Sequence, residues 1–168
     1  IETTIAQKYK LPLTDRFDIP QQNNDKVTYT SLAVDPSGAR FALGGKHLSL
    51  FDFSSLDQHR QAPFKVLDVE EGYNVVDVAF SNTGDRLIVG TGSVAPRILG
   101  RDGELIVEFI RGDMYVTDMA RTTGHTASVT GVCWNPLERD MVLTCSTDGS
   151  ARLWNLNGKT QFHKLVCD

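Results

Sequence analysis

Three stretches of the chain repeat one pattern, and this repetition constrains the fold more than any other feature. Residues 29–35, 75–81 and 129–135 read YTSLAVD, VVDVAFS and VTGVCWN, and each is followed by a turn rich in Pro, Gly or Asn. Alternation of apolar and polar residues is typical of β-strands. Three further short apolar runs follow each stretch, so each unit predicts four strands, and almost no segment has helical periodicity.

A four-stranded unit of about 40–45 residues, with Gly-His before its first strand and a Trp-Asp-like pair ending its third, is typical of WD40 β-propellers. Gly124-His125 and Trp154-Asn155 carry both halves of this pattern in the third unit. In the other units Phe51-Asp52 keeps only the acidic residue, and Leu99-Gly100 keeps neither. We therefore predict an all-β chain of the WD40 β-propeller type.

The units divide the chain into three four-stranded blades, at residues 27–70, 71–110 and 124–168. Closed propellers have at least four blades, so we expect these three to be part of a larger propeller of seven or eight blades. Residues 1–26 are expected to hold a ring-closing strand and a linker, and residues 111–123 an inserted loop. The span from Gly45 to Phe51 is two residues shorter than its counterpart, which indicates either a tight turn or residues missing from the chain.

The third unit supplies the residues of a buried polar brace within one blade. His125 is expected to bond Asp148, while a hydroxyl from Thr144 or Ser146 and the indole of Trp154 complete the chain of hydrogen bonds. Ser146, His125 and Asp148 are also the residue types of a nucleophile triad. A strained nucleophile turn such as G-x-S-x-G is absent, so the sequence favours the structural brace.

Composition argues against several classes of function. The net charge is -4, so the chain lacks the basic field that attracts phosphate backbones, and no apolar run approaches the roughly 20 residues that span a bilayer. Cys133, Cys145 and Cys167 lack the Cys-x-x-Cys spacing of zinc sites, so we expect three core thiols. We therefore expect no membrane partner, metal, cofactor or small-molecule substrate.

Four segments, at residues 35–45, 81–85, 101–104 and 111–127, resemble the gastrulation-defective family of nuclear WD-repeat proteins. The resemblance covers residues 29–156. It implies a nuclear scaffold whose partners are proteins of a large complex, in late pre-mRNA splicing or at chromatin. It also implies an alternative, a substrate receptor of a cullin-RING ubiquitin ligase in the DNA damage response. The Trp-Asp-x-Arg box of such receptors here reads Trp154-Asn155-Leu156-Asn157, without Asp or Arg.

Loops longer than a repeat requires often carry specificity, which directs attention to the insertion. Packing of its apolar residues on the neighbouring blade is the favoured interpretation, and the other is a partner-binding surface with Arg111, Asp113, Met114, Tyr115 and Met119 as candidates.

Two other functions have less support from the sequence. Contact with RNA would require a basic edge on the second unit, formed by Arg86, Arg97, Arg101 and Arg111. An enzyme would require paired acids, and Glu104, Asp113 and Asp118 have no such spacing. The sequence therefore favours a scaffold without catalytic activity.

Overall fold

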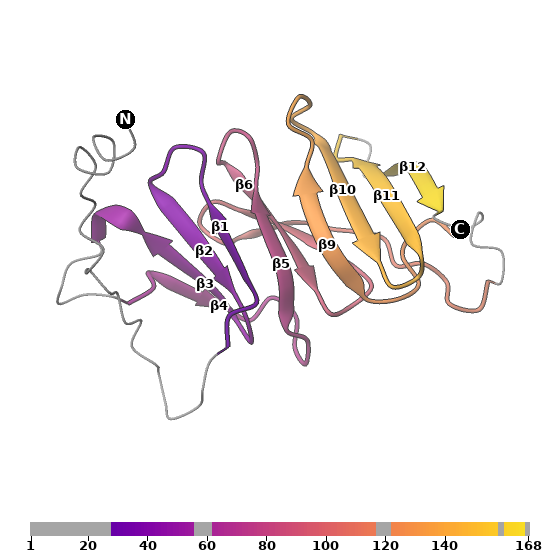
Figure 1. Cartoon of the computed structure of the whole chain (residues 1–168), viewed down its shortest axis with the longest axis horizontal. Helices are drawn as coiled ribbons and strands as arrows, with labels where there is room; N and C mark the ends of the chain where they lie inside the picture. Colours follow the sequence, from indigo (N-terminus) through magenta and orange to yellow (C-terminus); the bar gives the residue numbers. More distant parts are fainter. Residues whose placement is uncertain (1–27, 56–61, 117–121, 158–159, 167–168) are drawn as a thin grey trace, which may run out of the picture.

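The computed structural model describes residues 28–55, 62–116 and 122–157, together with the backbone of 160–166. Three four-stranded antiparallel sheets stand side by side along the long axis of the molecule (Figure 1). The first sheet contains β1 (Ser31–Val34), β2 (Arg40–Gly44), β3 (Leu48–Asp52) and β4 (Lys65–Leu67). The second contains β5 (Val75–Phe80), β6 (Arg86–Thr91), β7 (Arg97–Gly100) and β8 (Leu105–Glu108). The third contains β9 (Val129–Trp134), β10 (Met141–Ser146), β11 (Ser150–Asn155) and β12 (Thr160–Val166). The predicted all-β fold is confirmed.

Helical structure within the described ranges is limited to a single 3₁₀ turn, η1 (Phe53–Ser55). No helix in this part of the chain is long and apolar enough to cross a membrane. The N-terminal segment expected at residues 1–26 lies outside the described residues, as do residues 117–121 of the insertion.

Consecutive strands pair in order within each sheet, because short turns return the chain beside the strand it has just left. The turn after β1 and the turn after β5 have the same form. Gly38 donates its N–H to Asp35 O, and Gly84 donates to Ser81 O, with positive φ angles of 68° and 71°. Glycine suits both places because other residues rarely adopt this conformation.

The short span in the first unit is a tight turn. Residues 45–47 alone connect β2 to β3, and Gly45 N–H donates to His47 O at 3.2 Å. The two strands pair over their whole length, from Arg40 opposite Asp52 to Gly44 opposite Leu48. The first sheet is therefore complete without additional residues in this turn.

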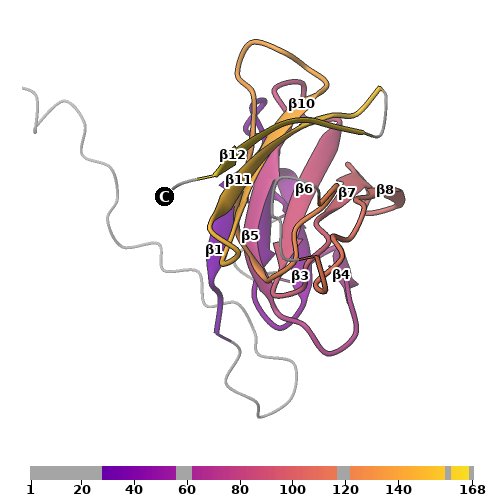
Figure 2. The ribbon, with the colours of Figure 1, turned by 90° about the vertical axis from the view of Figure 1, so that its right-hand side faces the viewer.

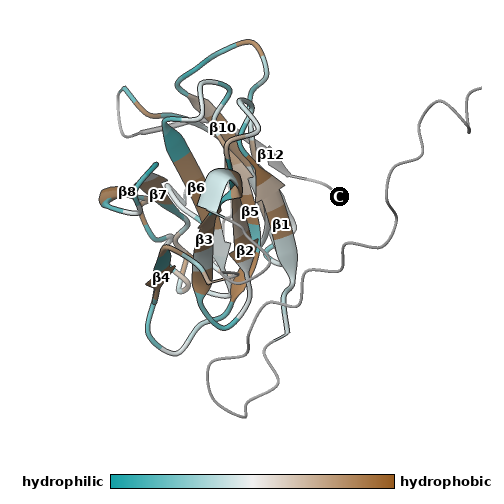
Figure 3. Ribbon diagram, turned by 90° about the vertical axis from the view of Figure 1, so that its left-hand side faces the viewer, coloured by the Kyte–Doolittle hydropathy of each residue, from teal (hydrophilic) through white to brown (hydrophobic). Residues whose placement is uncertain are grey.

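The second sheet packs against a neighbouring sheet on each of its faces. Along β6, Leu87 and Val89 pack against the first sheet, whereas Ile88 packs against the third. A strand that lies between two sheets reads as a continuous apolar run, as β6 does. Figure 3 shows the same distribution in colour, with most of the apolar residues on the strands.

Two hydrophobic clusters fill the spaces between the sheets. The cluster between the first and second sheets contains Ala42, Leu48, Leu50, Val75, Val78, Leu87, Val89 and Leu99. The cluster between the second and third sheets contains Ile88, Ile98, Phe109, Val129, Val132, Trp134, Val142, Trp154 and Leu156. Polar bonds join the same sheets, since Trp134 Nε1 donates to Ala79 O at 3.0 Å and Val132 N donates to Asp77 Oδ2 at 2.9 Å.

Glycine occupies the same position of the second strand in the first two units, and in both it faces the next sheet. A Cβ on Gly44 would lie 2.6 Å from Val75 Cγ1, and a Cβ on Gly90 would lie 3.1 Å from Val132 Cγ1. The missing side chains therefore allow the first strand of the following sheet to approach closely. Cys145 occupies the equivalent place in the third sheet.

The expectation that the cysteines are core thiols is wrong for the two that the structure describes. Cys133 and Cys145 are free and exposed, on the face of the third sheet turned away from the second. The inner face is taken by their strand neighbours, among them Val132 and Thr144. Cys167 lies outside the described residues.

A methyl group at Gly44 should disturb the packing between the first two sheets. We expect Gly44→Ala to lower the free energy of unfolding by about 1–3 kcal/mol, because overpacking forces neighbouring strands apart. Gly92→Ala is the matched control, since its Cβ would meet nothing closer than Tyr73 Cδ1 at 3.7 Å. We expect it to change stability by less than about 0.5 kcal/mol in the same urea titration. Equal effects of the two substitutions would contradict this account of the packing.

Candidate protein-interaction site

The third sheet contains a buried chain of side-chain hydrogen bonds. Trp154 Nε1 donates to Thr144 Oγ1 at 2.8 Å, and Thr144 Oγ1 lies 2.7 Å from His125 Nε2. On the other side of the ring, His125 Nδ1 lies 3.0 Å from Asp148 Oδ2. All four side chains are almost entirely buried. The structure thus brings together four of the five residues expected in the brace.

The partners of His125 fix its tautomer. A carboxylate can only accept a hydrogen bond, so the proton on the imidazole lies on Nδ1, toward Asp148. The indole already donates to Thr144, which leaves the threonine hydroxyl free to donate to Nε2. Each polar group in the chain therefore satisfies the next, which is the condition under which burying them is tolerable.

Asp148 also holds the turn between β10 and β11. Its Oδ1 accepts hydrogen bonds from the backbone and hydroxyl of Ser150, at 2.8 and 2.6 Å, and its Oδ2 accepts one from Thr126 N at 3.1 Å. Burial raises the pKa of this carboxyl, but the bonds from Ser150, Thr126 and His125 outweigh burial and lower the pKa to about 2. Asp148 is therefore the charged centre of the brace.

Ser146 lies next to the brace but is not a member of it. Its hydroxyl donates to Ala127 O at 2.9 Å and accepts from Asp148 N at 3.2 Å. The hydroxyl on His125 Nε2 belongs to Thr144 instead. The residue types of a nucleophile triad are thus present without the serine–histidine bond that such a triad needs.

The insertion begins and ends at two glycines that lie against each other. Gly112 N donates to His125 O at 2.8 Å, and a Cβ on Gly124 would lie 2.1 Å from Ile110 O. No side chain other than hydrogen fits between these backbones. The loop therefore leaves the blade and returns to it through one narrow base, directly beside the brace.

Charged residues hold the first end of that base. Arg111 Nη2 donates to Glu70 Oε1 at 3.1 Å, and Thr91 Oγ1 donates to Glu70 Oε2 at 3.0 Å. Arg97 Nη2 lies 3.8 Å from the same carboxylate, which is almost buried in the connection between the first two sheets. Arg111, expected to contact a partner, thus pairs with Glu70 while its side chain remains 59% exposed.

A second arginine, Arg152, holds the other end of the base of the insertion. Arg152 is fully buried, and its guanidinium donates to Thr122 O at 2.9 Å and to Thr122 Oγ1 at 2.8 Å. Arg97 occupies the equivalent position in the second unit and donates to Val69 O. Arg152 stands two residues before Trp154, and Arg97 stands two residues before Leu99, the equivalent residue of the second unit. Aligning the repeats therefore already shows that the two arginines are equivalent. Glu70, by contrast, had no sequence signal beyond its charge.

The tip of the insertion is exposed. Asp113 Oδ1 accepts a hydrogen bond from Tyr115 N at 2.9 Å, and this local turn directs the following side chains outward. Tyr115 is 89% exposed and Met114 is 69% exposed. They do not pack on the neighbouring blade, which was the favoured interpretation. Met119 lies outside the described residues.

The four arginines considered for RNA contact do not form one basic edge, so that expectation is wrong. Arg86 and Arg101 lie near the turn after β5 and pair with Asp140 and Asp35, at 3.1 and 3.2 Å. Arg97 and Arg111 lie near the opposite end of β7 and share Glu70 and Glu108. Each positive charge therefore has a carboxylate partner, which removes the expected field.

The acids considered for an enzyme belong to separate elements. Glu104 lies over Gly100 in the second sheet and Asp113 lies in the insertion, while Asp118 is outside the described residues. In the described ranges no group of three or more His, Cys, Asp and Glu residues could hold a metal ion.

Comparison with known proteins agrees with this architecture. The family model of the WD domain, G-beta repeat, matches residues 117–155, which contain the brace. WD repeat-containing protein 70 of Xenopus tropicalis is 38% identical over 156 residues, covering 92% of this chain and 25% of the relative. The human protein of the same name is 36% identical over 156 residues, with 91% and 23% coverage. Gastrulation defective protein 1 homolog of Drosophila melanogaster is 37% identical over 167 residues, with 98% and 25% coverage.

The sheets and the brace define the class, a WD40-repeat protein. Within that class the chain groups with WD repeat-containing protein 70 and with Gastrulation defective protein 1 homolog, to which it is similar over most of its own length. The resemblance predicted from the sequence is thereby confirmed. The chain spans about a quarter of the length of these relatives.

Replacing Thr144 with valine should remove the central hydroxyl of the brace while keeping the shape of the side chain. We expect Thr144→Val to lower the free energy of unfolding by about 3 kcal/mol, because His125 and Trp154 would each lose a buried hydrogen-bond partner. Thr130→Val is the control, since this hydroxyl is exposed and lies 3.4 Å from Cys145 Sγ. Urea denaturation of both variants measures the difference. A Thr144→Val variant as stable as Thr130→Val would show that the brace contributes nothing.

Asp148 should make stability depend on pH. Its folded pKa of about 2 lies below the ordinary value of 3.8, so its contribution is present above pH 4 and is lost as pH falls through 2. We expect the stability gap between the unmodified chain and Asp148→Asn to shrink by about 2 kcal/mol between pH 5 and pH 2. Urea titrations across this range measure the gap, and using the difference cancels the titration of other acids. A gap that stays constant would contradict the assignment.

Proposed function

We propose that this chain is part of a non-enzymatic scaffold that binds proteins of a large nuclear complex, with the tip of the insertion as a contact surface. The observation that carries the proposal is the exposure of Tyr115 and Met114 on a loop whose base is fixed. Large apolar side chains gain free energy when a partner covers them, and tyrosine and methionine are enriched at protein interfaces.

The fixed base supports binding because it reduces the entropy lost on association. Arg111 and Arg152 each tie one end of the loop to buried groups, and Gly112 and Gly124 close it. A loop that is already positioned loses less conformational freedom when a partner binds. Methionine adds adaptability at the tip, since its flexible side chain fits surfaces of different shape.

The cellular context of the proposal rests on the family resemblance, which favours pre-mRNA splicing or chromatin in the nucleus. The ubiquitin-ligase alternative has less support from this chain. Asn155 and Asn157 stand where the receptor box has Asp and Arg, and Asn155 Oδ1 accepts a hydrogen bond from Asn157 N at 2.9 Å within a local turn. The labelling experiment below distinguishes the ubiquitin-ligase alternative from the splicing or chromatin context.

Shortening the two exposed side chains of the tip to alanine should abolish binding of a partner protein without affecting the fold. We expect Met114→Ala/Tyr115→Ala, introduced into the intact protein, to lose at least one protein found by proximity labelling and mass spectrometry. The expected loss is about tenfold in signal, consistent with the free energies of interface anchors. Leu137→Ala is the matched control, because Leu137 is 92% exposed at the other end of the third sheet.

The identity of the lost proteins decides the context. Splicing or chromatin proteins would support the first version of the proposal, and cullin-ligase subunits would favour the alternative. Identical labelling by the tip variant and the unmodified protein would contradict a role for the insertion. A protein without any stable protein partner would contradict the scaffold itself.

A further inference from the structure

The brace and the base of the insertion share one residue, His125. Its buried ring is held between Thr144 and Asp148, as described above. Its backbone carbonyl accepts the hydrogen bond from Gly112 N, at 2.8 Å, that closes the base. The insertion therefore returns to the blade at a position set by side chains of β10 and of the turn between β10 and β11, two strands that lie side by side at the near end of the molecule in Figure 2.

A serine joins the brace to the arginine that holds the insertion. Ser150 Oγ donates to Asp148 Oδ1 at 2.6 Å and accepts from Arg152 Nε at 3.2 Å. Arg152 in turn donates to the carbonyl and the hydroxyl of Thr122. Ser150, Arg152 and Thr122 are all buried. Loss of one bond in such a chain leaves a buried polar group without its partner, so each link depends on the next.

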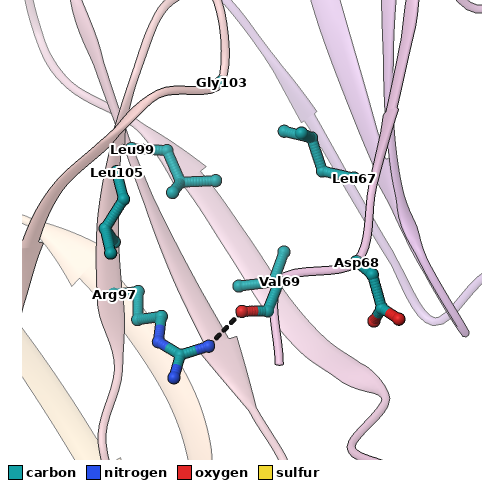
Figure 4. A pocket seen from close by; sticks show the side chains of 7 residues that line it. All are labelled: Leu67, Asp68, Val69, Arg97, Leu99, Gly103 and Leu105. Atoms are coloured by element: carbon teal, nitrogen blue, oxygen red, sulfur yellow. Dashed lines mark hydrogen bonds between the residues drawn. The ribbon is translucent and has the colours of Figure 1, made fainter. Parts of the chain in front are cut away.

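The second unit has the equivalent arginine without the serine. Arg97 binds Val69 O beside a cavity (Figure 4), but Ala95 stands where the third unit has Ser150. In the part of the chain that the structure describes, the buried Nε of Arg97 has no hydrogen-bond partner. The connection before the second unit contains no insertion. The serine is thus present in the unit that follows the insertion and absent from the unit that follows a short connection.

We propose that the brace positions the insertion for binding, and that Ser150 is the positioning residue that joins Asp148 to Arg152. A displacement of the brace then moves Arg152, and with it the end of the insertion at Thr122. The inference rests on the proposed function, because it names the residues that fix the geometry of the binding loop. It goes beyond that function in giving the brace a role in recognition as well as in stability. A loosened base should weaken binding even where the tip is unchanged, since more conformational freedom is lost on association.

Hydrogen exchange of single amides tests this link without any partner. The N–H of Gly112 reports on the base, because it is bonded to His125 O. The N–H of Val132, bonded to Asp77 Oδ2 at 2.9 Å, reports on the third sheet. We expect Ser150→Ala to raise the exchange rate of Gly112 about tenfold and that of Val132 less than about twofold, because the base opens locally while the sheet stays closed.

Ser81→Ala is the matched control. Ser81 is also buried, and its hydroxyl likewise donates to an aspartate, Asp85 Oδ1, at 2.8 Å. It follows β5 in the second sheet and has no bond to the brace or to the insertion, so we expect it to change the exchange of Gly112 less than about twofold.

Thr122→Val is a second variant that leaves the brace untouched, because it removes the hydroxyl to which Arg152 donates on the insertion. We expect it also to accelerate the exchange of Gly112. Since Ser150 and Thr122 act through the same arginine, the combined variant should accelerate this exchange by less than the product of the two single effects. A combined effect equal to that product would show that the two residues act independently, which overturns the inference.

Proximity labelling of the intact protein connects the link to binding. We expect Ser150→Ala to lose the same proteins as Met114→Ala/Tyr115→Ala, by about fivefold in signal, and Ser81→Ala to keep them. Unchanged exchange of Gly112 in Ser150→Ala, or an equal rise at Gly112 and Val132, would overturn the inference whatever the labelling shows. Loss of proteins by the tip variant but not by Ser150→Ala would overturn it as well. If the tip variant itself keeps every label, the proposed function fails, and the exchange of Gly112 still decides whether the brace holds the insertion.

Discussion

The packing of the second sheet between its two neighbours is the constraint on which the rest of the structure depends. Both of its faces must be apolar, and both must approach another sheet closely. Leu87 and Val89 meet one neighbour while Ile88 meets the other. Gly44 and Gly90 remove the side chains that would hold the sheets apart. The resulting stack is dense, so the ends of its strands have fixed positions from which loops can project.

Those fixed ends explain how a long insertion can have an exposed tip and an ordered base. The base is held by the buried Arg152 on Thr122, by two glycine backbones in contact, and by the exposed Arg111 on the almost buried Glu70. In the described part of the tip, residues 113–116, the hydrogen bonds are those of a local turn, and Met114 and Tyr115 face solvent. Binding residues of many proteins lie on loops positioned by a rigid scaffold in this manner. The division between base and tip is thus a physical argument for recognition.

The sequence was informative wherever one unit contains all the residues of a feature. Twelve strands follow from apolar alternation and turns, and the brace follows from Gly124-His125 and Trp154-Asn155 because its members lie in a single blade. Alternation shows which residues share a face but not which face is inside, and this is why Cys133 and Cys145 were misplaced. The pairing of the arginines failed for a different reason. Arg101 meets Asp35 and Arg86 meets Asp140, carboxylates of other units that only the stacking of sheets brings near.

The second unit shows what a repeat that lacks the motif retains. It has no histidine or tryptophan at the brace positions, yet its connection to the first sheet is held by Glu70, Thr91 and Arg97. Arg97 and Arg152 occupy equivalent positions and both bind the backbone of the connection before their own sheet. Both units therefore fix that connection with an arginine, and in the second unit the carboxylates of Glu70 and Glu108 pair with it in place of the His125–Thr144–Trp154 chain. The WD-domain model matches residues 117–155, which hold the unit that carries His125, Thr144, Asp148 and Trp154.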